Sequence, residues 1–258
     1  MGLFNFLKKN TPEQEKQTEM PTTTNEKYLG DLTKTAVIQN LVQTPHESRD
    51  EAWSYEFLNH VSQASFKCTN PQVIVGPDGF PYFQLLLPES GTSFECYVIE
   101  NMIDDFLLEK GLGVVVNPEG GNPDWVFTYG DVLSYKLFGG FYTDSGIRFS
   151  TNIKDETIQE QENVMVAQPS AAILPAYTRK IVQQFLTENG IKKPKIFLMI
   201  RGEGENITHD LVFNITPNNF ETEDSYRNVM QSLAWFLPKH YSLIGMNEEN
   251  FKDVFENL

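Results

Sequence analysis

The residue types best suited to metal binding and acid–base catalysis are sparse in this sequence. It has four histidines and two cysteines, and none of them stands in an H-x-x-x-H or C-x-x-C arrangement. His209 and Asp210 are adjacent and could be metal ligands, but the pair opens an expected strand and does not lie with further His and Asp ligands on helices. A role at a turn or strand edge is the alternative for both residues. We therefore predict no metal and no cofactor.

Recognisable nucleophile and phosphate-binding motifs are also missing from the sequence. There is no G-x-S-x-G elbow. Gly202-Glu203-Gly204 does not continue to a third glycine, and its glutamate would repel a phosphate. Cys68 and Cys96 stand outside any motif that activates a thiol, so we expect both to pack in the interior. These features favour a protein without enzymatic activity.

The composition predicts a folded chain with two domains. Of the 258 residues, 40% are hydrophobic and 12% aromatic, which is enough apolar material for a sizeable core, and the length suits two domains of about 100–150 residues. The net charge of −15 argues against nucleic acid as a partner, because that binding needs clustered Lys and Arg. Two cysteines are too few for a disulfide framework, which is typical of a reducing compartment.

Residues 1–30 divide into a short apolar start and a flexible polar tail. Residues 1–9 place Leu3, Phe4, Phe6 and Leu7 beside two lysines. A weak membrane or partner anchor is one interpretation of this segment, and a frayed terminus is the other. The sequence has neither a secretory signal nor an apolar run long enough for a transmembrane segment. We therefore expect a cytoplasmic protein.

Residues 31–150 are expected to form an N-terminal α+β domain. Ser48 and Glu51 have the spacing of a capping box before a helix, and Pro77-Asp78-Gly79 is expected to turn a hairpin over residues 72–87. A second helix follows over 98–107 and stops at Gly111. The remaining expected elements are strands over 114–116 and 125–129 and a short helix from Asp131.

Residues 151–162 are polar and acidic and form the expected linker to a C-terminal α+β domain over 163–258. That domain shows the order strand, helix, strand, strand, helix, strand, with Gly190 ending the first helix and Thr222 capping the second. This order is that of a ferredoxin-like, or split βαβ, arrangement, and we expect mainly antiparallel sheets in both domains. The expected elements are strands over 164–166, 195–200, 211–215 and 241–245, a helix after Pro175 that contains Ile181, Phe185 and Leu186, a helix from Glu223, and a closing helix over 251–255.

The two halves share a local pattern. Phe106 to Gly111 aligns with Phe185 to Gly190, and each segment is followed by an apolar strand, a glycine-containing turn, and a strand that opens with Asp124 or Asp210. Duplication of a helix-hairpin-helix module is one interpretation, and chance similarity is the other. The two aspartates either cap turns or form a paired acidic site. The candidate surface residues are Asp124, Trp125, Arg201, His209 and Asp210.

The C-terminal half resembles a known family. The runs Val164 to Ser170, Leu174-Pro175 and Lys193 to Leu198 are similar to the C-terminal domain of bacterial SseB-like (enhanced serine sensitivity) proteins, over roughly residues 160–246. The resemblance implies a bacterial cytosolic protein without an assigned catalytic site.

Three functional hypotheses follow from the sequence. The first is a non-enzymatic interaction or regulatory protein, with another protein as partner, that offers a sheet or hairpin edge. The second is a hydrolase with a dispersed site of Asp, Glu and His. The third is a peripheral membrane protein that binds through residues 1–9. Residues 31–150 carry 16 acidic against 6 basic residues, which favours either a basic partner or a solvated acidic surface.

Overall fold

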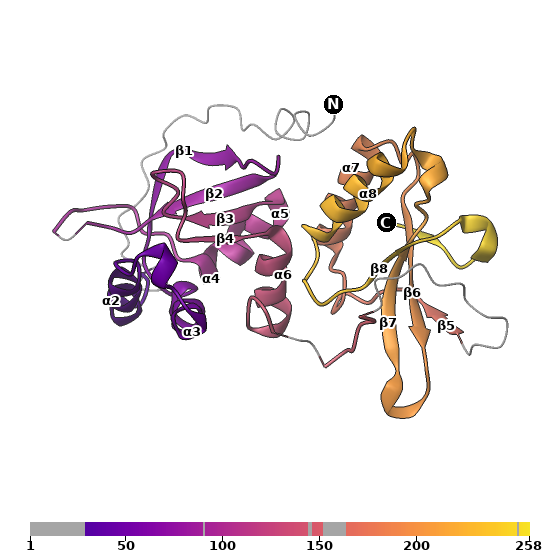
Figure 1. Ribbon diagram of the computed structural model, residues 1–258, viewed down its shortest axis with the longest axis horizontal. Helices are drawn as coiled ribbons and strands as arrows, with labels where there is room; N and C mark the ends of the chain where they lie inside the picture. The colour runs from indigo at the N-terminus through magenta and orange to yellow at the C-terminus, as the bar shows by residue number, and fades with distance from the viewer. Residues whose placement is uncertain (1–28, 90, 144–145, 152–163, 252) are drawn as a thin grey trace. The chain divides into compact units, whose positions relative to one another are not determined.

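The computed structural model describes residues 29–89, 91–143, 146–151, 164–251 and 253–258. The chain divides into two compact units, and the division falls between Val132 and Leu133. The part of the chain before it is unit 1 and the part after it is unit 2 (Figure 1). The predicted tail lies outside the described residues up to residue 28, as does the predicted linker after Thr151.

The described chain has an α+β fold with two mixed, open sheets of four and five strands. This confirms the predicted α+β class, and each sheet contains one parallel pair of strands. No helix among the described residues is long and apolar enough to cross a membrane.

Unit 1 begins with two helices, α2 (Leu32–Leu41) and α3 (Glu51–Val61), joined through a short 3-10 turn, η2 (His46–Ser48). Asp31 caps α2 and Asp50 caps α3, each through a side-chain oxygen that accepts backbone N–H groups. The predicted capping box at Ser48 is therefore wrong, because Asp50 lies one residue before the helix and its carboxylate accepts from Trp53 N–H at 2.8 Å.

The sheet of unit 1 consists of β1 (Lys67–Val75), β2 (Pro81–Leu86), β3 (Gly113–Val116) and β4 (Trp125–Phe127), in that spatial order. The β1–β2 and β3–β4 pairs are antiparallel, whereas β2 and β3 are parallel. The parallel pair is connected by one continuous helical stretch: α4 (Ile99–Met102), the π-helical η3 (Ile103–Leu107) and α5 (Leu108–Lys110). Gly111 ends this stretch at φ 71°, as the sequence predicts.

The core of unit 1 forms between the helices and one face of its sheet. Trp53 and Phe57 of α3 stack on Trp125 of β4, with ring centroids 6.0 and 5.4 Å apart. Phe83 of β2 packs on Phe106 at 5.2 Å. Figure 1 shows α2 and α3 on the same side of this sheet. A last helix, α6 (Tyr129–Phe138), follows β4 and contains the division between the units.

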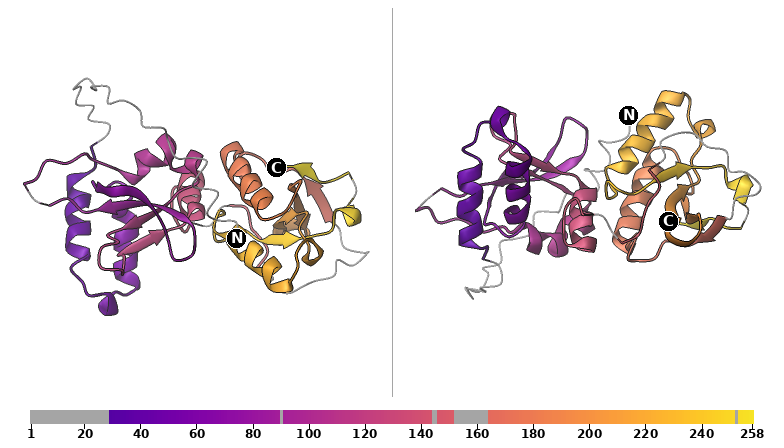
Figure 2. Two further views of the ribbon diagram at one scale, coloured as in Figure 1. Left: turned by 90° about the horizontal axis from the view of Figure 1, so that it is seen from above. Right: turned by 60° about the horizontal axis from the view of Figure 1, so that its bottom comes forward.

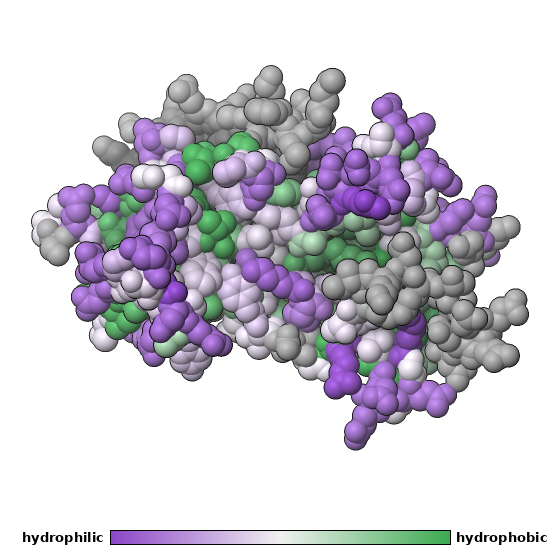
Figure 3. All heavy atoms as spheres, in the orientation of Figure 1, coloured by the Kyte–Doolittle hydropathy of each residue, from purple (hydrophilic) through white to green (hydrophobic). Residues whose placement is uncertain are grey.

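Unit 2 contains β5 (Val164–Ala167), α7 (Ala176–Glu188), β6 (Lys195–Arg201), β7 (Thr208–Phe213), α8 (Glu223–Ala234) and β8 (Leu243–Gly245). Two 3-10 turns, η4 (Gly204–Asn206) and η5 (Pro217–Asn219), follow β6 and β7. The helices α7 and α8 lie side by side in both views of Figure 2, and Phe185 and Phe236 pack with centroids 4.9 Å apart. The projecting end of the β6–β7 hairpin is hydrophilic (Figure 3).

The predicted ferredoxin-like arrangement is wrong. A split βαβ unit would place another strand between β5 and β6, but these two strands pair directly and antiparallel. The observed path is β5-β6-β7-β8, with β7 and β8 parallel. The order of elements along a sequence does not specify which strands become neighbours, so the pattern could not distinguish the two sheets.

The predicted closing helix over 251–255 is also wrong. The chain forms a 3-10 turn, η6 (Glu248–Phe251), and then β9 (Glu256–Asn257), which pairs antiparallel with Lys195 and Ile196 of β6. Phe251 and Phe255 pack their rings against Phe197 on the sheet. This C-terminal segment therefore covers part of the face whose core residues are Phe197, Met199 and Val212.

Candidate functional site

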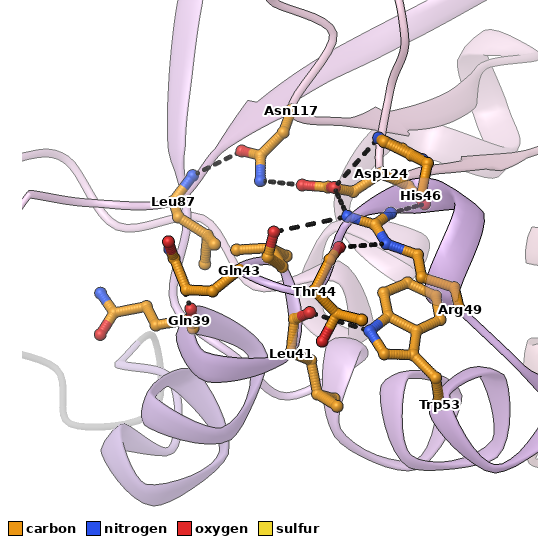
Figure 4. A network of polar contacts seen from close by, with 11 residues as sticks. Gln39, Leu41, Gln43, Thr44, His46, Arg49, Trp53, Leu87, Asn117 and Asp124 are labelled. Carbon is orange, nitrogen blue, oxygen red and sulfur yellow. Dashed lines mark hydrogen bonds and ion pairs between the residues drawn. The ribbon is translucent and has the colours of Figure 1, made fainter.

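In unit 1, the predicted site residue Asp124 forms a polar network with Arg49 (Figure 4). Arg49 Nη2 donates to Asp124 Oδ1 at 2.6 Å, and the exposed fractions of the two side chains are 8% and 10%. Asn117 donates its side-chain amide to the other carboxylate oxygen. His46 Nε2 lies 3.9 Å from Asp124 Oδ1. The charge of the carboxylate is thus balanced by Arg49, and both of its oxygens have partners within unit 1.

The remaining donors of Arg49 fix the segment between α2 and α3. Its Nε donates to the Thr44 carbonyl at 3.0 Å, and its Nη2 lies 3.4 Å from the Val42 carbonyl. The guanidinium also lies 4.4 Å from the ring centroid of Trp53, a cation–π distance. Trp53 in turn donates its indole N–H to Leu41 at 2.8 Å. Arg49 therefore connects the helices to the β3–β4 turn, which is a structural role.

The predicted site residue Trp125 is half-buried and belongs to an aromatic stack of unit 1. It lies beside the rings of Trp53, Phe57 and Phe127, with centroids 5.4 to 6.1 Å apart. Its contacts with Trp53 and Phe57 place it on the face of the sheet that α3 covers. We interpret Trp125 as a packing residue, because its ring faces other apolar rings of the same unit.

In unit 2, Asp210 and Arg201 form the second ion pair. Asp210 is fully buried, and its Oδ2 accepts from Arg201 Nε at 3.1 Å and lies 3.0 Å from Nη2. Its Oδ1 accepts from the Ser242 hydroxyl at 2.6 Å. Arg201 Nη2 also donates to Ser150 Oγ at 3.4 Å. Two nitrogens of Arg201 and the hydroxyl of Ser242 thus satisfy one buried carboxylate, as burial of a charge requires.

His209 projects from the opposite face of β7 to Asp210, because side chains alternate along a strand. Its Nδ1 lies 3.0 Å from the Arg148 carbonyl, and its ring packs on Phe149 at 6.1 Å. Phe149 also stacks on Tyr241, with centroids 4.1 Å apart. Burial raises the pKa of the Tyr241 hydroxyl, which donates to the Ile173 carbonyl at 3.0 Å. His209 and Asp210 are adjacent in sequence, but their side chains lie on opposite faces of β7 and contact different residues.

The five predicted site residues form two groups. Asp124 and Trp125 belong to unit 1, whereas Arg201, His209 and Asp210 belong to unit 2. Each aspartate has its own arginine. Within the described part of the chain, no three His, Cys, Asp or Glu side chains are placed to hold a metal ion.

Both cysteines are half-buried thiols, so the expected interior packing is wrong for each. Cys68 Sγ lies 3.4 Å from Gln72 Nε2, which also lies 3.2 Å from the Tyr97 hydroxyl. Burial and the neighbouring Cys68 and Glu95 raise the pKa of Tyr97. Cys68 lies at the irregular part of β1, and Cys96 lies in the segment before α4, outside the helices and strands.

The strand β5 has an exposed outer edge, which is not among the five predicted site residues. It is the outermost strand of the described sheet, and three of its four residues are exposed, including Met165 at 56% and Val166 at 42%. Alternate residues of an outermost strand direct their N–H and C=O groups away from the sheet. The uncharged run Val164-Met165-Val166-Ala167 was the only sequence signal of this edge, and it did not reveal whether the strand would be central or outermost.

The other outermost strands of the two sheets are less suited to pairing. β1 is irregular between Cys68 and Val73 and contains Pro71, and bulges and prolines are common means of protecting an edge. β4 and β8 have only three residues each. β5 is regular over its whole length and contains neither charge nor proline.

Comparisons with protein-family models, with curated proteins and with solved structures each find no match.

Proposed function

We propose that this protein is a non-enzymatic interaction protein that binds an extended segment of a partner protein by strand addition at β5. The observation that supports this proposal is the regular outer edge of β5 with its exposed apolar side chains. Strand addition supplies affinity through main-chain hydrogen bonds and specificity through alternate side chains. In β5, Val164 and Val166 point to one face of the sheet, and Met165 and Ala167 point to the other.

The other two hypotheses have less support. A hydrolase with dispersed acids and imidazoles needs these groups to converge, whereas the predicted candidates Asp124, Asp210 and His209 each engage in contacts that hold their own unit together. The membrane hypothesis depends on residues 1–9, which lie outside the described residues. The resemblance to SseB-like proteins, with the bacterial cytoplasmic location that it implies, stays a prediction.

A synthetic peptide of alternating valine and threonine tests strand addition directly. We expect amide hydrogen exchange of the full-length protein to slow at alternate residues of β5 when this peptide binds. Two N-methylated forms of the peptide sharpen the result. Methylation of the amides that face β5 should abolish binding, and methylation of the alternate amides should leave it intact.

Substitution of Val166 by lysine should weaken peptide binding about tenfold, because it removes an apolar contact worth about 1.4 kcal/mol. Val75→Lys is the matched control, since Val75 has the same exposed fraction of 42% on the irregular strand β1. Equal weakening by both variants, or equal binding of the two N-methylated peptides, would contradict the proposal.

A further inference from the structure

We infer that Asn189 is a site of spontaneous deamidation, which the last turn of α7 holds closed and which opens when that turn frays. Asn189-Gly190 is the only Asn-Gly pair in the sequence. In such a pair the backbone nitrogen of the glycine can attack the side-chain amide of the asparagine, because the glycine has no side chain that hinders the approach. Asparagine is counted among the thermolabile residue types.

The reaction needs water as its only co-reactant. The Gly190 nitrogen forms a bond to Cγ of Asn189, the bond between Cγ and Nδ2 breaks, and Nδ2 leaves as ammonia with the proton of the Gly190 N–H. Water then opens the five-membered succinimide ring. Cleavage of the ring bond from nitrogen to Cγ yields aspartate. Cleavage of the ring bond from nitrogen to the backbone carbonyl carbon yields isoaspartate, in which the main chain passes through Cγ.

The way α7 ends accounts for a glycine after Asn189. Gly190 has φ 96°, a left-handed conformation that favours glycine. Its N–H donates to the Thr187 carbonyl at 3.2 Å, and the Ile191 N–H donates to the Leu186 carbonyl at 3.0 Å. These two bonds form a Schellman motif, with Asn189 as the C-cap residue.

The same turn keeps the two reacting atoms apart. Asn189 has ψ 17°, which nearly eclipses the Gly190 nitrogen with the nitrogen of Asn189 itself, whereas ring closure needs it to turn towards Cβ. The half-buried Asn189 side chain also donates from Nδ2 to the Phe185 carbonyl at 2.9 Å. Ring closure therefore requires three hydrogen bonds to break, those donated by Asn189 Nδ2, the Gly190 N–H and the Ile191 N–H.

These hydrogen bonds set how far the fold slows the reaction. A typical intramolecular hydrogen bond shifts an opening equilibrium about fivefold, so three of them close the turn about a hundredfold. Fraying helix ends open far more readily than the core of a domain. We therefore expect Asn189 to react from a frayed turn while the rest of unit 2 stays folded.

Deamidation would weaken the end of α7. The product lacks the donor to the Phe185 carbonyl and places a carboxylate beside the carbonyl groups of the helix C-terminus, where negative charge is unfavourable. Unit 1 offers an internal comparison. Gly111 ends its helix in the same left-handed conformation but follows Lys110, so this reaction is not available there.

The test follows deamidation of the full-length protein at mildly alkaline pH, by mass spectrometry of the proteolytic fragment that contains residue 189. A synthetic peptide of residues 185–194 gives the rate without the fold. We expect the folded protein to react about a hundredfold more slowly than the peptide, and the protein unfolded in urea to react at the rate of the peptide. Amide exchange of Ile191, which reports the same opening, should be slowed by a similar factor.

Three variants sharpen the result. Ile191→Ala should accelerate deamidation about tenfold, because Ile191 is 4% exposed and anchors the turn in the core. Ile173→Ala is the matched control, since Ile173 is 5% exposed and lies before the opposite end of α7, and it should leave the rate unchanged. Asn189→Lys, which copies Lys110 of unit 1, should abolish the mass change and so assign it to this residue.

Three outcomes would overturn the inference. Equal rates in the folded protein and the peptide would show that the turn does not hold the site closed. Product that forms only after urea has unfolded unit 2 would show that the site does not open by fraying. Equal acceleration by Ile191→Ala and Ile173→Ala would assign the opening to the whole of unit 2.

Discussion

Asp124 in unit 1 directly precedes β4 and Asp210 in unit 2 is the third residue of β7, and their arginine partners come from different distances along the chain. Arg49 lies 75 residues from Asp124, between the helices of unit 1. Arg201 lies 9 residues from Asp210, on the adjacent strand of the same hairpin. One pair therefore joins distant parts of a unit, whereas the other lies within a single hairpin and reaches other segments only through Ser150 and Ser242. Similar local sequence can thus serve a global and a local structural role.

The largest expected effect is that of Arg49→Ala. It would leave Asp124 buried without its positive partner and remove the contacts to Thr44 and Trp53, at a cost of about 3–5 kcal/mol. Hydrogen exchange should accelerate throughout unit 1 and stay unchanged in β6 and β7. Arg49→Lys, which keeps the charge, should have an intermediate effect. Uniform acceleration in both units would contradict the proposed division of roles.

Asp210→Asn should have a smaller effect, about 1–3 kcal/mol, because Arg201 is 18% exposed and also contacts Ser150. The acceleration of exchange should be confined to the end of the β6–β7 hairpin and the residues near Ser242. Equal acceleration of hydrogen exchange throughout unit 2 would show that the Arg201–Asp210 pair stabilises the whole unit and contradict the expected local role.

Gly190→Ala tests the left-handed glycine that follows a helix in both units. Gly190 has φ 96°, and an added Cβ would meet no atom within 4 Å, so the cost comes from backbone conformation alone. We expect a loss of about 1 kcal/mol in the free energy of unfolding of unit 2, measured by denaturant titration. Gly146→Ala, a glycine with open space and no positive φ, is the control and should change stability little.

The smallest expected effect is a pH dependence from Tyr241. Burial raises its pKa in the folded state, so the contribution is complete below the ordinary value near 10 and declines as the pH rises from there towards the folded pKa. At about pH 10.5 the expected loss is about 0.8 kcal/mol. Tyr241→Phe should remove this contribution to the pH dependence of the free energy of unfolding of unit 2. An unchanged slope would assign the titration to other groups.

Much of the secondary structure could be predicted from the sequence, because apolar periodicity and glycine stops are local signals. Gly111 and Gly190 both adopt the expected left-handed conformation, and Thr222 caps α8 through the Ser225 N–H. Strand pairing could not be predicted in the same way. β2 and β3 are parallel across their helix, whereas β5 and β6 are antiparallel across theirs, although the two helices end alike.

The sequence identified the candidate residues, but it did not predict which side chains they contact. Asp124 and Asp210 stand out in the sequence because they repeat in equivalent positions. Arg49 had no comparable signal, since the contact spans most of unit 1 and depends on tertiary packing. The open edge of β5 was equally hidden, because an apolar run of four residues has the same sequence whether its strand is central or outermost.

The pairing of β9 with β6 has a consequence for synthesis of the chain on the ribosome. Lys195 and Ile196 acquire this neighbour only when Glu256 and Asn257 have been translated. Until then the nascent chain presents Phe197 without the rings of Phe251 and Phe255 that later cover it. The hairpin is therefore exposed to chaperones and to misassembly for longer than its early position in unit 2 would suggest.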